Sequence, residues 1–384
     1  MLKITTKILL SSLFFYIFDS FIKLSKNKDF IKNSIIIVKL DNVGDFIIFM
    51  DLAIKLRKKY EKYKIILYTT EICSELAINT NIFDEVITVL PQKMTHNLIY
   101  RFSILKNIYN RSALKIIQPV FSRVFLTGDS LVRASSAKEK YGFLGDYSRS
   151  IYFQKKISNL WYSNLIKTTN FEINEIVRQN KLGEIIGIET NKSTPYEMLP
   201  IVSDLKKFRI SNYIVIFPGS SWAGRCWPIN RFIELIKEIL LISNVNIVLC
   251  GSILEVDICN IISQDINNER LKNLSGITTL SELVEIIRGA NFVISNETSA
   301  IHISASVGVE SICILGGGHF NRFVPYPENV NIKYKPIAVY KNSKCFNCNW
   351  SCTVNPSNSL TMPCILDISI DSVLYEVNKK LLND

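Results

Sequence analysis

The sequence predicts an α/β protein with two doubly wound domains. Short β-branched runs alternate with helical segments from residue 34 onward, and the same alternation starts again near residue 200. This alternation is typical of parallel sheets joined by right-handed crossovers. The length of 384 residues also fits two domains, since a domain usually has about 100–200 residues. With 48% hydrophobic and 21% charged residues, the composition excludes a disordered or fibrous chain.

The elements of the first domain follow from local patterns. Residues 35–40 form a β-branched run that ends in turn-forming residues, which predicts a buried strand entering a loop. A helix is expected over 46–60, where basic residues gather at the C-terminal end and offset the helix dipole. Further strands are predicted over 64–69 and 86–90. Residues 97–181 indicate further α/β elements and helices without clear boundaries.

The second domain repeats this pattern. Strands are predicted over 213–217, 245–249, 292–295 and 311–315. Helices are predicted between them, over 228–241, 280–288 and 300–307. Open α/β sheets bind ligands at the carboxyl ends of their strands. The loops that follow these strands are therefore the candidate binding loops.

Charge and cysteine usage narrow the choice of partners and compartment. The 45 basic and 34 acidic side chains leave a net charge of +11, which favours a nucleic acid, an anionic membrane or a phosphorylated substrate without choosing among them. Nine unevenly spaced cysteines fit a reducing compartment better than a disulfide framework. A cluster of four cysteines near the C-terminus begins with a Cys-x-x-Cys spacing, which suits a zinc site. The alternative is that these cysteines are reduced thiols that bind no metal. The members of this cluster are Cys345, Cys348, Cys352 and Cys364.

The N-terminal segment predicts a helix that lies on a membrane. An apolar run over 8–18 ends at Asp19 and Lys23, short of the roughly 20 residues that a spanning helix needs. A helix packed on the protein's own core and a signal anchor are the alternatives. Helical spacing with lysines close by favours the interfacial position. The apolar positions are Leu10, Leu13, Phe14, Ile17, Phe21 and Leu24.

Three loops that follow strands carry polar side chains. Asp45 comes after the first strand, where a carboxylate is either a helix cap or a general base, and the two roles are compatible. The loop 217–228 contains two glycines, two serines and Arg225, a combination that suits a diphosphate. The loop 295–302 brings hydroxyls, a carboxylate and a helix start to the same edge. The three glycines of 316–318 are expected to let a ligand lie against the backbone.

Four motifs in order resemble glycosyltransferase family 9, the ADP-heptose:lipopolysaccharide heptosyltransferases. The resemblance covers residues 34–370, and neither a P-loop nor a G-x-G-x-x-G motif is present. It implies a GT-B fold of two Rossmann-like domains facing a cleft, with the donor in the C-terminal domain and the acceptor and base in the N-terminal domain. The motifs are Lys39-Leu-Asp-x-x-Gly-Asp45, Pro218-Gly-Ser-Ser-x-x-x-Arg-x-Trp-Pro228, Leu274-Ser-Gly-x-Thr-x-Leu-x-Glu-Leu283 and Asn296-Glu-Thr-Ser-Ala-Ile-His302.

The resemblance also implies roles for individual residues. Asp45 matches the general base, and Arg225 matches a position usually held by a lysine that neutralises the donor phosphates. Where the common loop of the family reads Asp-[Ser/Thr]-Gly, this chain reads Glu297-Thr298-Ser299. The carboxylate is therefore longer and the third residue carries a Cβ, so the identity of the donor sugar stays open. The other implied phosphate ligands are Ser220 and Ser221, and the implied nucleotide or sugar contacts are Glu297, Thr298, Ser299, Ala300 and His302.

The resemblance therefore implies an inverting, metal-independent glycosyltransferase without a cofactor, which moves heptose from ADP-heptose onto a lipopolysaccharide core or related glycolipid. A UDP- or GDP-linked donor is the alternative. We expect the protein on the inner face of the cytoplasmic membrane and without a nucleic-acid partner, because no recognition motif is visible. A nucleotide-sensing module without catalysis is a further alternative. The expected segments are a membrane-associating segment (1–32), an acceptor domain (33–200), a donor domain (201–368) and a C-terminal helix that packs toward the N-terminal domain (369–384).

Overall fold

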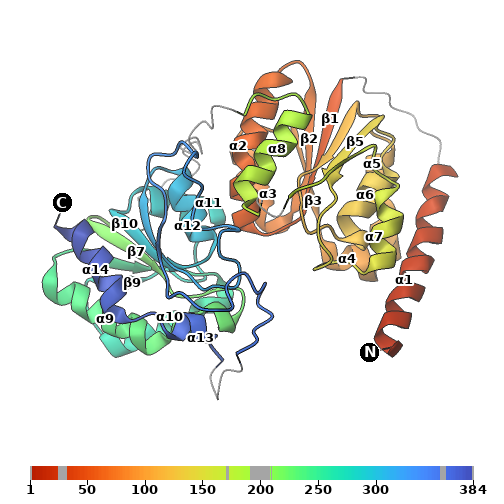
Figure 1. Cartoon of the computed structure of the whole chain (residues 1–384). Coiled ribbons are helices and arrows are strands. Elements are labelled where there is room, and N and C mark those ends of the chain that lie inside the picture. Colours follow the sequence, from red (N-terminus) through yellow and green to blue (C-terminus); the bar gives the residue numbers. More distant parts are fainter. Residues whose placement is uncertain are drawn as a thin grey trace. The chain divides into compact units, whose positions relative to one another are not determined.

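The computed structural model describes residues 2–24, 33–169, 173–190, 208, 210–354 and 360–382. The chain forms two compact units (Figure 1). The predicted domain boundaries at residues 32 and 200 lie outside the described residues. The first unit comprises Met1–Glu172 and Arg178–Thr190, and the second comprises Ile173–Val177 and Asn191–Asp384.

The first unit is built on a parallel six-stranded sheet in the order β3-β2-β1-β4-β5-β6. In β1, Ile36 and Val38 pack in a core cluster with Leu105 of α5, while Ile35 and Ile37 are also fully buried. Since side chains alternate along a strand, both faces of the sheet are covered. The strands are β1 (Ser34–Lys39), β2 (Lys64–Thr70), β3 (Glu85–Val89), β4 (Lys115–Gln118), β5 (Glu139–Phe143) and β6 (Asn164–Ile166). The helical elements are α1 (Leu2–Ser20), η1 (Phe21–Leu24), α2 (Val43–Lys59), α3 (Glu71–Asn79), α4 (Pro91–His96), α5 (Leu98–Tyr109), η2 (Phe125–Asp129), α6 (Ser130–Ala134), α7 (Tyr152–Asn159) and α8 (Glu175–Ile185).

The second unit contains another parallel six-stranded sheet, in the order β12-β11-β10-β7-β8-β9. The strands are β7 (Tyr213–Phe217), β8 (Asn246–Leu249), β9 (Leu271–Asn273), β10 (Phe292–Asn296), β11 (Glu310–Ile314) and β12 (Ile337–Val339). The helical elements are η4 (Ala223–Arg225), α9 (Ile229–Ile242), η5 (Ile253–Glu255), α10 (Val256–Ile266), α11 (Leu280–Arg288), α12 (Ser299–Ser306), α13 (Pro363–Leu366) and α14 (Ile370–Leu381).

Both sheets have the same topology. When the strands are counted within each unit, each order is 3-2-1-4-5-6, the arrangement of the dinucleotide-binding α/β fold. The direction of winding reverses between β1 and β4 in the first sheet and between β7 and β10 in the second. Ligands bind at such switch points, at the carboxyl ends of the strands. The predicted fold class, two doubly wound α/β domains, is confirmed.

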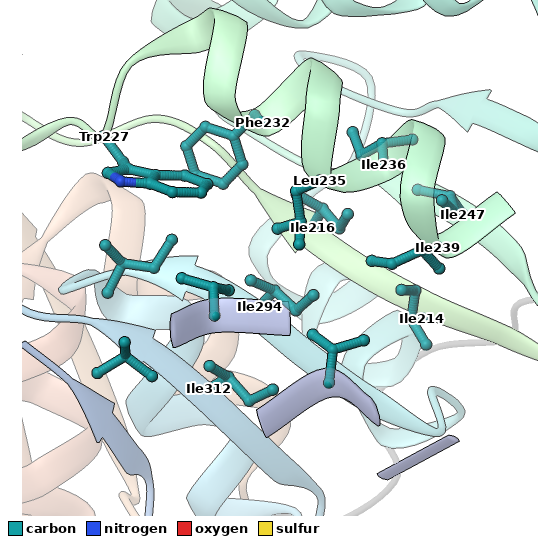
Figure 2. Packing of buried hydrophobic residues seen from close by; sticks show 14 of the residues in the cluster. Ile214, Ile216, Trp227, Phe232, Leu235, Ile236, Ile239, Ile247, Ile294 and Ile312 are labelled. Carbon is teal, nitrogen blue, oxygen red and sulfur yellow. The ribbon is translucent and has the colours of Figure 1, made fainter. Parts of the chain in front are cut away.

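The core of the second unit lies between its sheet and α9 (Figure 2). Trp227 and Phe232 are almost fully buried, and their rings meet edge to face with centroids 5.2 Å apart. Burial of each such side chain stabilises the fold by about 1.5–3 kcal/mol. On α14, Val373 and Val377 are buried in this same core. The predicted packing of the C-terminal helix toward the N-terminal domain stays a prediction.

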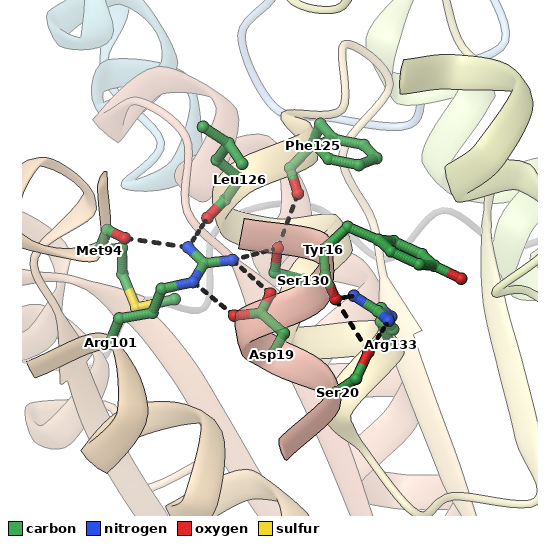
Figure 3. A network of polar contacts seen from close by, with 9 residues as sticks. All are labelled: Tyr16, Asp19, Ser20, Met94, Arg101, Phe125, Leu126, Ser130 and Arg133. Atoms are coloured by element: carbon green, nitrogen blue, oxygen red, sulfur yellow. Dashed lines mark hydrogen bonds and ion pairs between the residues drawn. The ribbon is translucent and has the colours of Figure 1, made fainter. Parts of the chain in front are cut away.

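Helix α1 is held to the first unit by a buried ion pair (Figure 3). The guanidinium of Arg101 donates to both carboxylate oxygens of Asp19, at 2.7 and 2.6 Å. It also donates to the carbonyls of Met94 and Leu126 and to the hydroxyl of Ser130. A buried ion pair is stable only when its remaining hydrogen-bonding groups are also satisfied, and here several further acceptors surround the arginine.

The opposite side of α1 is apolar and exposed. Five of the six residues predicted to face a membrane are 52–64% exposed, while Phe15, two residues from Leu13, is buried. One side of the helix therefore packs on the protein, as the alternative of a helix on the protein's own core predicted, while the other side faces outward and its binding to a membrane stays a prediction. No helix among the described residues is long and apolar enough to cross a membrane. The exposed residues are Leu10, Leu13, Phe14, Ile17 and Phe21.

Candidate active site

A buried amide joins two of the predicted binding loops. Strands β7 and β10 pair in parallel, so their loops leave the same edge of the sheet. Asn296, at the end of β10, donates to the carbonyls of Pro218 (2.7 Å) and Gly219 (3.1 Å). Its side-chain oxygen accepts a hydrogen bond from the Trp227 backbone N–H at 3.0 Å. The sequence motif contains Asn296, but its organising role was not predicted.

Arg225 and Glu297 meet at this edge of the second sheet. The Arg225 guanidinium donates to the Glu297 carbonyl, and its Nη2 lies 3.5 Å from the carboxylate Oε2. Among the described residues, neither Arg225 Nε nor Glu297 Oε1 has a hydrogen-bond partner, although both atoms are buried. Buried polar atoms of this kind are normally satisfied, so these two atoms are a candidate position for a bound ligand or an ordered water.

The Glu297 carboxyl has a strongly perturbed acidity. Burial raises its pKa to about 7, and the nearby charges of Arg225 and Arg322 offset this only in part. The side chain therefore changes its charge near neutral pH. Such perturbed carboxyls are common at functional sites, where a proton or a ligand compensates the buried charge.

The start of α12 lies directly after Glu297. Thr298 caps the helix, since its hydroxyl accepts from the Ala300 N–H at 3.3 Å and shares a 2.8 Å hydrogen bond with Ser295. Ser299 is the first residue of the helix. The free N–H groups and the dipole of a helix start favour an anion. The predicted contacts of Thr298, Ser299 and Ala300 with a donor stay predictions.

His302 lies deeper in the same helix. Its Nδ1 is 2.7 Å from the hydroxyl of Tyr326, and the two rings stack with centroids 5.8 Å apart. Burial lowers the imidazole pKa to about 4, with a smaller contribution from Arg225. The ring is therefore neutral at physiological pH.

In the loop before η4, Ser220 is half-buried and Ser221 is exposed.

Trp350 is a residue of this site that sequence reasoning missed. Its ring lies 5.6 Å from the Arg225 guanidinium and meets the Trp222 ring edge to face at the same distance. The backbone φ of Trp350 is +61°, a left-handed conformation that is strained for a bulky residue. Its buried indole N–H has no hydrogen-bond partner among the described residues. Trp350 lies within the cysteine-rich segment, which was interpreted only for metal binding.

The glycines of 316–318 make room for aromatic side chains of the protein itself, and the expected ligand contact along their backbone stays a prediction. A Cβ on Gly317 would lie 2.2 Å from the ring of Phe346, and one on Gly318 would lie 2.3 Å from the ring of Trp350. These clashes leave no room for a side chain. The aromatic side chains occupy the space that the glycines provide.

The four predicted thiols line one small cavity of about 110 Å³. Cys352 donates to the Val354 carbonyl, and Cys364 accepts from the Gly317 N–H. In the part of the chain that the structure describes, no three Cys, His, Asp or Glu side chains are placed to hold a metal ion. This arrangement does not fit a zinc site, and zinc binding by Cys345, Cys348, Cys352 and Cys364 stays a prediction that elemental analysis tests.

Asp45 belongs to the corresponding edge of the first sheet. Helix α2 begins at Val43 rather than at residue 46, and Asn42 occupies the cap position. Asp45 therefore lies in the first helical turn and is half-buried. Lys39, at the end of β1, donates to Asp41 at 2.8 Å and to the carbonyl of Pro119 at 3.0 Å. This buried lysine joins the loop after β1 to the loop after β4.

Comparison with known proteins identifies the family. The family model described as glycosyltransferase family 9 (heptosyltransferase) matches residues 130–349, more than half of the chain. The chain belongs to glycosyltransferase family 9. The family resemblance is confirmed, and the protein is a glycosyltransferase. No curated protein matches the chain by sequence.

Solved structures of the family share the fold at low identity. A family 9 glycosyltransferase from Veillonella parvula is 13% identical with a TM-score of 0.72, and the match covers 92% of this chain and 98% of that one. The Escherichia coli ADP-heptose lipopolysaccharide heptosyltransferase II is 18% identical, with a TM-score of 0.64 and coverage of 91% and 99%. E. coli heptosyltransferase WaaC with ADP-2-deoxy-2-fluoro heptose is 15% identical, with a TM-score of 0.65 and coverage of 90% and 99%.

Proposed function

We propose that this glycosyltransferase moves heptose from ADP-heptose onto a lipopolysaccharide core or a related glycolipid, with inversion and without a catalytic metal. The observation that carries the proposal is the half-buried Arg225 beside the start of α12, whose buried Nε has no hydrogen-bond partner among the described residues. Solved structures of WaaC with ADP and with an ADP-heptose analogue support a nucleotide-sugar donor. The domain assignment follows, with the acceptor in 33–200 and the donor in 201–368.

On the donor side, Arg225 and the N–H groups at the start of α12 bind the diphosphate. The contact between Arg225 Nη2 and Glu297 Oε2 is long at 3.5 Å, so phosphate oxygens compete with it readily. Negative charge grows on the leaving diphosphate as the bond to the sugar breaks. A preorganised guanidinium stabilises this charge more in the transition state than in the ground state. Ser220 and Ser221 supply hydroxyls from the same loop.

On the acceptor side, Asp45 acts as the general base. The acceptor oxygen attacks the anomeric carbon, its proton passes to the Asp45 carboxylate, and the bond from the anomeric carbon to the phosphate oxygen breaks. Attack from the face opposite the leaving group inverts the anomeric configuration. General bases of this kind contribute about 10²–10⁴-fold to the rate.

The exposed apolar side of α1 binds the inner face of the cytoplasmic membrane. Leu13, Phe14 and Ile17 are each more than half exposed, and several lysines precede and follow them in the sequence. Apolar burial at the interface together with basic residues near anionic lipid is sufficient for peripheral binding, at about 1 kcal/mol per well-placed basic residue. The acceptor, a membrane lipid, then lies at the same surface.

A second candidate function is transfer from a UDP- or GDP-linked sugar. The sequence Glu297-Thr298-Ser299 favours it, because the family's common loop has a shorter carboxylate and a glycine at these positions. The longer, buried carboxyl with a pKa of about 7 offers a different hydrogen-bonding group to the sugar.

A thermal-shift series with ADP, UDP and GDP tests the donor assignment. A ligand at 100 times its Kd adds about 2.7 kcal/mol to the stability of the folded state. We expect ADP to stabilise the protein most, and a preference for UDP or GDP would favour the second candidate. Transfer from ADP-heptose to rough lipopolysaccharide, with and without chelator, then tests the reaction and its metal independence. Stabilisation by none of the three nucleotides contradicts the proposal.

A further inference from the structure

A cavity of about 800 Å³ lies in the first unit, at the carboxyl edge of its sheet. Val124, Phe125 and Leu126 contribute to it from the segment that follows β4, and residues 147–152 contribute from the segment that follows β5. Strands β1, β4 and β5 are neighbours in a parallel sheet. The cavity therefore lies at the same edge of the sheet as the Asp45 loop, and the hydrogen bond from Lys39 to Pro119 joins that loop to the start of the segment after β4.

Helix α1 is joined to the walls of this cavity. Gln154, which lines the cavity, donates to the hydroxyl of Ser12 at 2.9 Å in a buried contact. The ring of Phe125 lies 5.0 Å from that of Trp161, which stacks on Tyr16 of α1. The carbonyl of Leu126 accepts from Arg101, the ion-pair partner of α1 (Figure 3). The helix and the cavity walls are thus connected by direct contacts.

The rim of the cavity is aromatic and exposed, and its inner wall is apolar. Tyr147 and Tyr152 stack with ring centroids 6.3 Å apart, although they are 60% and 68% exposed. Tyrosine prefers the boundary between the headgroups and the hydrocarbon of a bilayer. Arg149 is also exposed at this rim and carries a charge suited to a lipid phosphate. The apolar surface inside comes from Val124, Leu126 and Ile151, which line the cavity and are half-buried, with the buried Phe125 behind them.

We propose that this cavity binds an acyl chain of the anionic, lipid-linked acceptor, an inference that rests on the proposed function. The chain lies against Val124, Phe125 and Leu126, while Arg149 faces the anionic headgroup. Helix α1 brings the unit to the bilayer, so the chain enters the cavity without crossing bulk water. The saccharide end then lies along the sheet edge toward Asp45. The cavity thereby selects acceptors that carry a lipid chain.

Binding of a monomeric lipid to the full-length protein tests this site. The probe is palmitoyl-lysophosphatidylglycerol below its micellar concentration, compared with glycerophosphoglycerol, which has the same headgroup and no chain. We expect the wild type to bind the lysolipid at least tenfold more tightly than the headgroup compound. V124W, which places an indole ring against the apolar wall where the chain is proposed to lie, should weaken lysolipid binding at least tenfold. Y147S/Y152S changes only exposed side chains and should weaken lysolipid binding about threefold to fivefold. This double variant tests the site independently if V124W does not fold.

Two controls separate the cavity from other surfaces. L241S changes a side chain of the second unit that is 78% exposed and should leave lysolipid binding unchanged. I17S should weaken binding to phosphatidylglycerol vesicles without changing the affinity for the monomeric lysolipid. Equal binding of the lysolipid by wild type, V124W and Y147S/Y152S would overturn the proposal, as would tight binding of the headgroup compound alone.

Transfer kinetics connect the cavity to the acceptor. We expect the KM for intact rough lipopolysaccharide to be at least tenfold lower than that for the same material without its acyl chains, and V124W should abolish this difference at unchanged kcat. Equal KM values for both acceptors in the wild type would contradict the assignment to the acceptor. ADP stabilisation measured on the same samples keeps the two proposals apart, because its loss would contradict the transferase function and leave the lipid site intact.

Discussion

The two units share one topology, yet their carboxyl edges carry different chemistry. The second sheet places buried charge at its switch point, where Arg225 meets Glu297 beside the start of α12. The first sheet places a half-buried carboxylate, Asp45, at the corresponding point, with a partly apolar cavity lined by the segments that follow the next two strands, β4 and β5. The difference shows that the strand order provides a location, while the loops decide what binds there. A charged edge suits a diphosphate, and an apolar edge with one base suits a lipid-linked hydroxyl compound.

The largest expected effect is at the first edge. D45N removes the proposed base without changing the size of the side chain, so turnover should fall by about 10²–10⁴-fold. Nucleotide affinity should stay within about twofold, because the donor belongs to the other edge. The matched control is D51N, which breaks the 2.7 Å pair with Lys55 in the same helix and should leave turnover nearly unchanged. Near-normal turnover of D45N would show that Asp45 is not the general base and serves only as part of helix α2.

At the second edge, R225A should lower turnover by about 10²–10³-fold and weaken donor binding. R225K keeps the positive charge but loses the paired N–H donors of the guanidinium, so it should retain much more activity than R225A. Steady-state kinetics with varied donor, together with melting temperatures, measure both. R231A is the control, because Arg231 donates to the carbonyls of Leu366 and Ile368 and should affect stability alone. Equal losses in R225A and R225K would make Arg225 a structural residue.

The third prediction concerns the buried carboxyl of the second edge. The pKa of Glu297 is raised from 4.5 to about 7 in the folded protein, so between these values the folded state binds more protons than the unfolded state. The Glu297 contribution to stability therefore falls as the pH rises from about 5 to 7.5. The glutamine of E297Q cannot ionise. The unfolding free energy of E297Q should therefore rise by on the order of 2–3 kcal/mol relative to that of the wild type as the pH increases over this range. Denaturant unfolding at several pH values measures this difference, and a constant difference would contradict the raised pKa.

The smallest expected effect is on membrane binding. F14S/I17S makes the exposed side of α1 polar and should reduce binding to phosphatidylglycerol vesicles about tenfold. Activity on a soluble acceptor should not change, since the buried pair between Asp19 and Arg101 still holds the helix. Vesicle flotation measures the first effect and steady-state kinetics the second. L241S serves again as the surface control, and vesicle binding equal to that of the wild type would exclude α1 as the contact.

Much of the fold was predictable because its signals are local. The strand predicted over 35–40 is β1, and the helix predicted over 280–288 is α11, which Thr279 and Glu282 begin with a capping box. The start of α2 was missed because its first turn, Val43-Gly-Asp, has little apolar periodicity. The segment 97–181 was hard to interpret because its elements are short, with α6 only five residues long.

The sequence by itself determined the two parallel sheets, the family and the loops that carry Asp45, Arg225 and Glu297, because alternation and motif spacing are properties of neighbouring residues. Only the tertiary structure decided which distant groups meet. Arg101 pairs with Asp19 across 82 positions of the chain, and Trp350 reaches Arg225 from a segment interpreted for metal binding. The acidity of Glu297 likewise depends on burial, which desolvates its charge, and burial is set by the whole packed unit rather than by the residues on either side.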